Sequence, residues 1–112
     1  NGIMNAYKSM YEDASYHKAM AHAHGEHSAA HESEVTNGGH EDHDYAGTDH
    51  AEAENSHKAA ATAYEKHGPT SQQYKSAAAT ADKHSKIAHR SSSDAGEFKE
   101  TSPSGAKFPK KT

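Results

Sequence analysis

Histidines spaced seven residues apart constrain the fold of this sequence more than any other feature. Two series follow this spacing: His17, His24 and His31, and then His43, His50 and His57, which Tyr64 continues. Seven residues make two turns of an α-helix, so each series lies along one helical face. The sequence therefore predicts helices that carry imidazole on the face where Leu or Ile usually lies.

The remaining apolar residues are few and small. Only 31% of the 112 residues are apolar, 21 of them are alanine, and Leu, Trp and Cys are absent. Typical soluble domains are 45–50% apolar. Because burying a Leu contributes about 1.5–3 kcal/mol and a methyl group much less, an alanine core offsets little of the backbone entropy lost on folding. We expect one small domain that a metal ion, a protein partner or self-association helps to order.

The periodic pattern predicts an all-α fold with three helices. Apolar and histidine positions recur with a helical period over residues 3–34, which predicts a long N-terminal helix. An antiparallel helical hairpin follows over 49–91, with a helix from 49 to 67, the stop Gly68-Pro69, and a helix from 70 to 91 capped by Thr70 or Ser71. The pattern leaves open whether the first helix packs on this hairpin.

Two segments lack this period. Residues 35–48 read as a connection, because Asn37-Gly38-Gly39 is a strong helix stop, and they place His40 and His43 in an acidic loop before an N-cap at Asp49. Residues 92–112 are rich in Ser, Gly, Pro and Lys, and they predict an extended or disordered arm that carries Phe98 and Phe108.

Clustered histidines make transition-metal binding the leading hypothesis. Imidazole binds copper, zinc and nickel, and helical residues three or four apart project together. His24, His27 and His31 have this spacing, and His17 with Met20 adds a thioether suited to Cu(I) or Ag(I). His40 and His43, among three carboxylates, form a second candidate site. The candidate ligands are therefore His24, His27, His31, His17, Met20, His40 and His43.

Packing is the alternative for several of these side chains. A seven-residue interval is about 10.5 Å of helix rise, too far for one ion to bridge two members of a series. The series themselves therefore favour a packing seam, in which polar residues set the register. Packing is favoured for His50, His57, His84 and Tyr64, and gap-filling in the core is favoured over metal ligation for Met20. His40 and His43 equally suit a solvated loop.

Composition and motifs argue against several classes of function. The net charge is −4, and the one basic cluster, Lys107, Lys110 and Lys111, is short, which argues against nucleic-acid binding. No run approaches the ~20 apolar residues of a membrane span. The sequence contains no HExxH, P-loop or dinucleotide-binding motif and no nucleophile–base pattern. We therefore expect a protein that is not an enzyme.

The segment HAEAENSHKAAATAYEKHG and the alanine-rich helix after it resemble two groups of proteins. One is the small histidine-rich helical proteins that bacteria export and that bind copper and other divalent ions. The other is the Ala/His/Lys-rich helical segments of phage head and other virion structural proteins, which assembly orders. The resemblance lies in composition and spacing across residues 17–89.

These observations lead to two functional hypotheses. The first is a metal-binding helical protein, and the second is a structural subunit of a virion or filament that self-associates or binds a protein partner. The chain begins at Asn1, which fits a processed N-terminus and hence an exported, periplasmic or virion-associated protein.

Overall fold

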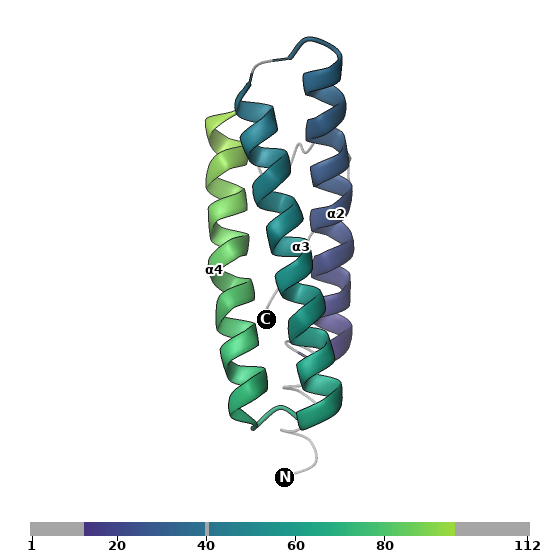
Figure 1. Ribbon diagram of the computed structural model, residues 1–112, viewed down its shortest axis with the longest axis vertical. Coiled ribbons are helices and arrows are strands. Elements are labelled where there is room, and N and C mark those ends of the chain that lie inside the picture. The colour runs from purple at the N-terminus through teal and green to yellow at the C-terminus, as the bar shows by residue number, and fades with distance from the viewer. Residues whose placement is uncertain (1–12, 40, 96–112) are drawn as a thin grey trace.

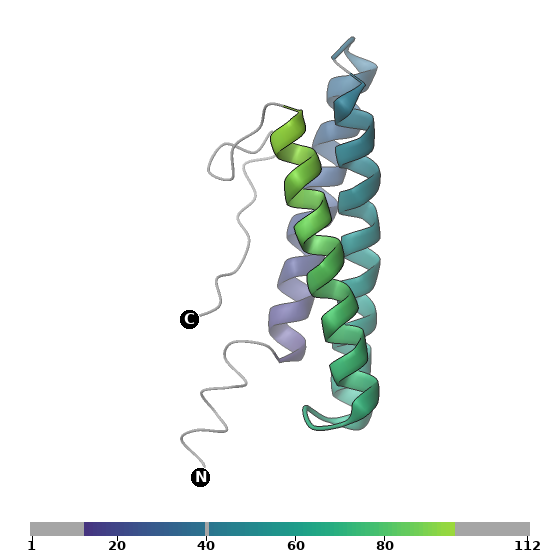
Figure 2. The same cartoon turned by 90° about the vertical axis from the view of Figure 1, so that its left-hand side faces the viewer.

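Three helices lie side by side and form an elongated bundle (Figure 1). The structure is a computed structural model that describes residues 13–39 and 41–95. Its helices are α2 (Ala14–Thr36), α3 (Asp42–His67) and α4 (Gln72–Asp94). The predicted all-α, three-helix arrangement is therefore confirmed, and α3 and α4 form the expected antiparallel hairpin (Figure 2).

The middle helix, α3, holds the bundle together. It packs against α2 along one side and against α4 along another. The outer helices α2 and α4 run in the same direction, and no Cα atom of one lies within 8 Å of a Cα atom of the other. Side chains that connect α2 with α4 must therefore cross a wide interior.

Local sequence signals explain most helix ends. Asp13 and Ser71 are N-caps, and each side chain accepts a hydrogen bond from the backbone amide three residues later, at 2.9 and 3.1 Å. The predicted stops also hold. Gly38 has a φ of 90° and Gly68 a φ of 86°, a conformation that glycine adopts without the steric cost of a Cβ. The predicted cap at Ser71 and the predicted stop at Gly68 are thus confirmed.

The start of α3 differs from the prediction. The helix begins at Asp42 rather than at residue 49, so the second half of the predicted connection is helical and His43 lies in the first turn. Asp42 and Asp44 favour this start, because carboxylates stabilise the positive end of the helix dipole. Asp49 is not an N-cap. Its carboxylate instead accepts a hydrogen bond from the hydroxyl of Ser91 on α4.

Gly47 lies inside α3 without breaking it. Its missing side chain lets α2 approach closely, and the hydroxyl of Ser28 donates a 2.8 Å hydrogen bond to the Gly47 carbonyl oxygen. A Cβ built at Gly47 would lie 3.4 Å from the Ser28 carbonyl oxygen and 3.5 Å from the His31 Cβ. The glycine therefore marks a helix contact rather than a turn.

Alanines and a few aromatic side chains make up the apolar part of the core. The completely buried alanines on α3 and α4 are Ala46, Ala53, Ala60, Ala81 and Ala88. Tyr74 packs against Ala60 and Ala81, and its ring meets the edge of Tyr64 at a centroid distance of 5.1 Å. The largest fully buried side chains, however, are histidines.

Two predicted segments fall partly outside the described residues. The N-terminal helix was expected from residue 3, and its first ten residues lie outside them. The predicted arm, 92–112, contributes its first three residues to the end of α4, and residues 96–112 lie outside. Within the described part of the chain, no helix is long and apolar enough to cross a membrane.

Candidate functional site: paired histidines in the bundle core

Three pairs of histidines face each other across the contact between α2 and α3. In each pair the two Nδ1 atoms lie within hydrogen-bond distance: 2.9 Å for His17–His57, 2.8 Å for His24–His50 and 2.8 Å for His31–His43. A neutral imidazole carries one N–H donor and one acceptor nitrogen. One ring of each pair therefore donates from Nδ1, and its partner accepts.

Burial holds these rings in the neutral form. His24, His31 and His50 are 0% exposed. Burial, with smaller contributions from His50 and His57, lowers the pKa of His24 to about 2. Burial and the rings of His27 and His31 lower the pKa of His50 to about 3. Burial and the rings of His43 and His27 lower the pKa of His31 to about 4. At neutral pH each of these three rings is therefore uncharged and keeps one nitrogen lone pair that can accept a hydrogen bond or bind a metal ion.

Side chains of α4 connect the three pairs to one another. Ser85 lies 2.8 Å from Nε2 of His57 and 2.8 Å from Nε2 of His24. Ser92 lies 2.7 Å from Nε2 of His50 and 3.3 Å from Nε2 of His31. We call Ser85 and Ser92 the bridging serines. They carry the interaction across the gap between α2 and α4.

A tyrosine hydroxyl ends this array, which is continuous along the bundle. The hydroxyl of Tyr74 lies 2.9 Å from Nε2 of His17. We call the whole array the core network. In order of contact its members are Tyr74, His17, His57, Ser85, His24, His50, Ser92, His31 and His43.

Ring stacking packs successive pairs against one another. His24 stacks on His57 at a centroid distance of 5.7 Å, and His31 stacks on His50 at 5.5 Å. His27, which lies between His24 and His31 on α2, stacks on His50 at a centroid distance of 5.1 Å. The imidazoles thus form a column that occupies the space a leucine core would fill.

The structure brings the predicted ligands together across the helices rather than along α2. His17, His24 and His31 each direct Nδ1 at a partner on α3. His43, expected in a loop, is the α3 partner of His31. His27 and Met20 are buried on α2, while His40 lies outside the described residues. Within those residues, no group of three or more His, Asp or Glu side chains is arranged to hold a metal ion.

The residues expected to pack do so for the most part. His50 and His57 are buried in the seam, which confirms their predicted packing role. His84 is instead partly exposed, and its Nδ1 lies 3.5 Å from a carboxylate oxygen of Glu52. On α4 the buried residues include Ser85 and Ser92, whose contacts with the histidines the sequence interpretation missed.

Two sequence signals could have found these contacts. The histidine pairs are symmetric about Asn37 at 20, 13 and 6 residues to each side, as an antiparallel hairpin turning at Asn37 requires. The bridging serines also repeat at seven residues. Serine is common on solvent-facing surfaces, so its period carries little weight until the partner helices are known.

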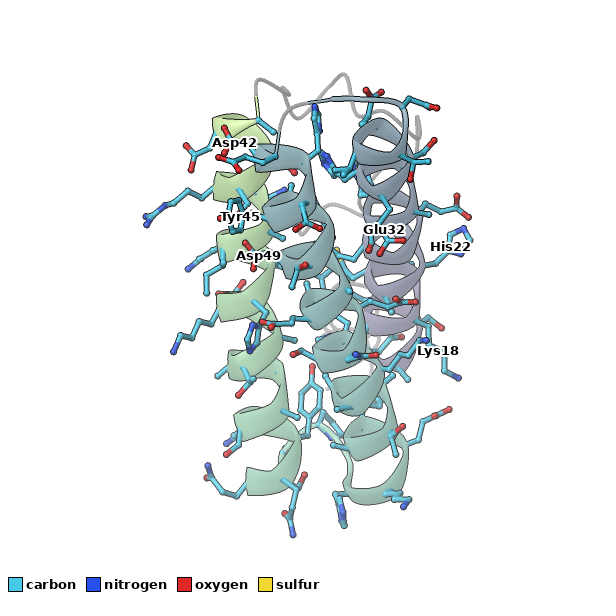
Figure 3. All side chains as sticks on the ribbon, turned by 45° about the horizontal axis from the view of Figure 1, so that its top comes forward. Lys18, His22, Glu32, Asp42, Tyr45 and Asp49 are labelled. Carbon is cyan, nitrogen blue, oxygen red and sulfur yellow. The ribbon has the colours of Figure 1, made fainter. Side chains whose placement is uncertain are left out.

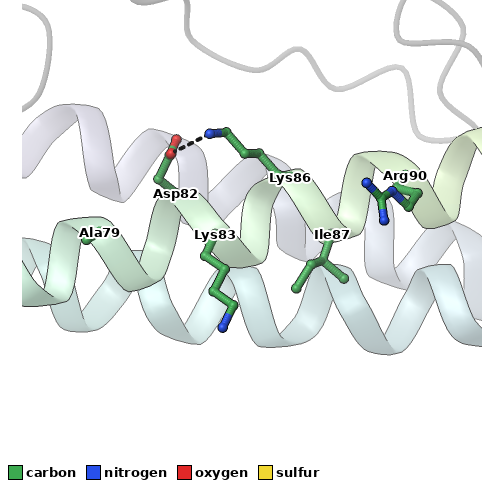
Figure 4. A pocket seen from close by; sticks show the side chains of 6 residues that line it. All are labelled: Ala79, Asp82, Lys83, Lys86, Ile87 and Arg90. Carbon is green, nitrogen blue, oxygen red and sulfur yellow. Dashed lines mark ion pairs between the residues drawn. The ribbon is translucent and has the colours of Figure 1, made fainter.

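The outer surface is polar and separate from the core network. Lys18, His22 and Glu32 project from α2, and Asp42 and Tyr45 project from α3 (Figure 3). On α4 a surface hollow of about 300 Å³ is lined by Ala79, Asp82, Lys83, Lys86, Ile87 and Arg90 (Figure 4). Its ion pair, Lys86–Asp82 at 3.2 Å, is an exposed contact between successive helical turns.

Comparisons with known proteins give no family or relative for this chain. No family model, no curated protein and no solved structure matches it.

Proposed function

We propose that this protein is a non-enzymatic metal-binding protein that takes up transition-metal ions between its paired histidines. The observation that carries the proposal is the pairing itself: three sets of Nδ1 atoms aim at each other at 2.8–2.9 Å. Two opposed neutral imidazoles are a ligand set for copper or zinc. Five of the six rings, those of His17, His57, His24, His50 and His31, have a hydroxyl partner at Nε2 that fixes their orientation, as histidine ligands usually have.

The size of each pair fits an ion after a small opening of the seam. Metal–nitrogen bonds of about 2.0 Å place two ligand nitrogens about 3.3 Å apart in tetrahedral geometry and about 4 Å apart in linear geometry. The pair His24–His50 must therefore open by about 0.5–1.2 Å. A core of alanines and stacked rings has few bulky side chains that would oppose this movement.

The number of ligands per pair favours an ion that accepts two. Within residues 13–39 and 41–95, no site offers three or more His, Asp or Glu ligands. Monovalent copper and silver accept two nitrogens in a near-linear arrangement, whereas structural zinc takes four ligands. We therefore propose Cu(I) as the preferred ion, with Zn(II) and Ni(II) bound more weakly.

The bridging serines support metal uptake. An ion between two Nδ1 atoms leaves both rings with an Nε2–H donor. Ser85 then receives hydrogen bonds from His24 and His57 together, which its two lone pairs allow. Its own hydroxyl proton is free to turn to a backbone carbonyl one helical turn earlier. The network thus accommodates every pair in the metal-bound form.

Anaerobic titration with Cu(I) in the presence of a competing chelator tests this function, with Zn(II) and Ag(I) as comparison ions. We expect up to three ions per chain at the pairs. His24→Gln with His50→Gln should remove one ion. The matched control, His22→Gln with His67→Gln, changes two exposed histidines and should remove none. Equal stoichiometry in the two double variants would refute the assignment.

Self-association is a second candidate, and charge segregation favours it. Lys83, Lys86 and Arg90 form an exposed basic face on α4 (Figure 4), whereas Asp42 and Asp44 lie at the start of α3. Opposed charge patches of this kind steer association between copies. Sedimentation at 50 and 500 mM salt tests it. Larger species that dissociate at high salt are expected, and a monomer under both conditions would exclude it.

A further inference from the structure

The core network is a continuous array of alternating donors and acceptors, and this gives it a property that no single pair has. Each neutral ring holds one proton, so a ring that donates from Nδ1 must accept at Nε2. A bridging serine that donates to one ring must accept from the other, because it has a single hydroxyl proton. When both bridging serines donate within the network, the direction of one hydrogen bond therefore fixes the direction of all eight.

Two arrangements satisfy every bond with both bridging serines donating within the network. In the first, His17, His24 and His31 on α2 carry the proton on Nδ1, and their partners on α3 carry it on Nε2. In the second arrangement, the three histidines on α2 carry the proton on Nε2, and their partners on α3 carry it on Nδ1. All histidines on one helix therefore have the same tautomer. The reason is that each of the three Nδ1 bonds joins α2 to α3, and the Nε2 hydrogen bonds of the network are made to hydroxyl groups of α4.

We propose that the core network is a proton relay that links His43 at one end of the bundle with Tyr74 at the other. In the second arrangement, a proton arriving at Nε2 of His43 releases the Nδ1 proton of that ring to Nδ1 of His31. His31 then passes its Nε2 proton to Ser92, and Ser92 passes its own to His50.

The same steps continue to the far end. His50 passes its Nδ1 proton to His24, and His24 passes its Nε2 proton to Ser85. Ser85 passes its hydroxyl proton to His57, which passes its Nδ1 proton to His17. His17 protonates the oxygen of Tyr74, whose own proton leaves. One proton has entered and one has left, and the network now has the first arrangement.

The His43 end of the relay differs from its middle in a way that suits proton entry. His43 is partly exposed, whereas the five other histidines of the network are at most 2% exposed. The α2 histidines His17 and His31 are 14 residues apart, or about 21 Å of helix rise. The relay therefore spans most of the bundle interior through side chains alone. It does not depend on metal binding, and it is tested in metal-free protein.

The test replaces His43 by a fixed hydrogen-bond acceptor or donor and measures the resulting tautomer of His17. His43→Asp places an acceptor beside Nδ1 of His31, which forces that ring to donate. His43→Lys places a donor there, which forces the ring to accept. Histidine labelled with ¹⁵N distinguishes the tautomers by NMR in EDTA at pH 8. We expect all three α2 histidines to be Nδ1–H in the first variant and Nε2–H in the second.

Controls separate the relay from local effects. Asp44→Lys changes the charge next to His43 but not the network, and it should leave the tautomers of His17 as in the wild type. In the double variant Ser85→Ala with His43→Asp, the tautomers of His24 and His31 should be fixed, but the tautomer of His17 should not. Ser85→Thr keeps a hydroxyl and should restore the effect at His17.

In the wild type, exchange spectroscopy should show His17 and His31 changing tautomer at one common rate. Opposite tautomers on one helix, the same His17 tautomer in both His43 variants, or different exchange rates or no exchange at the two rings would each overturn the proposal. The wild-type measurement decides the matter even if a variant does not fold.

Discussion

Nδ1 of His24 lies 2.8 Å from Nδ1 of His50, and both side chains are completely buried. Two basic side chains hold this position because neither is charged: burial is the largest cause that lowers both of their pKa values. Their contact is thus a hydrogen bond between neutral rings, and its stability depends on both partners being present.

A double-mutant cycle should show this dependence. His24→Leu or His50→Leu alone leaves the partner Nδ1 buried without its hydrogen bond, which costs about 1–3 kcal/mol. The double variant removes both polar groups, and each bridging serine keeps its other histidine. We expect the double variant to lose less than the sum of the single losses, by about 1–2 kcal/mol. Urea unfolding measures the four stabilities.

The matched control is the cycle of His22→Leu and His67→Leu, which changes two exposed histidines on the same two helices. Their effects should add, because nothing links the two side chains. Additive losses at His24 and His50 as well would mean that the short Nδ1 distance carries no coupling.

Acid should unfold the bundle well above the pKa of an ordinary carboxyl group. The pKa values of His31, His50 and His24 are lowered to about 4, 3 and 2 in the folded protein, against 6.5 for an unperturbed histidine. Below pH 6.5 the unfolded chain therefore binds protons that the folded protein does not. The free energy of unfolding rises with pH up to about 6.5 and is then level with respect to these groups.

The expected size of this effect is large. Together the three histidines should reduce the free energy of unfolding by about 4 kcal/mol between pH 7.5 and 5.5. Such a loss is comparable to the whole stability of many small domains. Urea unfolding followed by circular dichroism at the two pH values measures it. Equal stability at both would mean that these rings are protonated in the folded state.

Two glycines should respond in opposite directions to alanine. Gly38 has a φ of 90°, so Gly38→Ala should cost about 1–2 kcal/mol through backbone strain. Gly25 lies inside α2, where alanine is favoured by about 1 kcal/mol. Its new Cβ would meet the carboxylate of Glu54 at 2.7 Å, but that is the far end of a flexible side chain paired with Lys58.

Gly25→Ala should therefore stabilise the protein by about 0.5–1 kcal/mol once the Glu54 carboxylate has moved. Thermal unfolding of both variants at pH 7.5 measures the two shifts. A loss of stability in Gly25→Ala would show that Glu54 is fixed in place by its contacts.

The sequence predicted the helices better than it predicted the contacts between them. The first histidine series and the stop at Gly38 indicate α2, the stop at Gly68 ends α3, and the cap at Ser71 begins α4. Each of these signals is local in the sequence. The start of α3 was placed too late because Asp49 was taken for its N-cap. The helix continues through Gly47, which contacts Ser28 of the neighbouring helix, and local patterns do not reveal this contact.

The candidate site shows the same division. His50 and His57 were correctly expected in a seam, since their period places them on one face. The pairing of His31 with His43, however, needs the antiparallel register, and the role of Ser85 needs the position of α4 relative to both other helices. Both contacts depend on how the helices pack against one another, and neither histidine nor serine indicates this packing by its residue type.

Metal uptake at the pairs should release no protons. The two neutral rings of a pair, such as His24 and His50, carry two protons in all, and one of these lies between the two Nδ1 atoms. When an ion binds both Nδ1 atoms, this proton is replaced by one on the Nε2 atom of the same ring, so both rings remain neutral. Because the pKa values of both rings are far below neutrality, neither ring carries an additional proton that the ion could displace.

Calorimetric titration with Ag(I) at pH 6.5, in two buffers that differ in ionisation enthalpy, measures the number of protons released. We expect none per ion bound at the pairs. The variant His24→Gln with His50→Gln should bind one ion fewer, again without proton release. Release of protons on binding would place the ions on side chains that are partly protonated at this pH rather than between the paired Nδ1 atoms, and would contradict the proposed site.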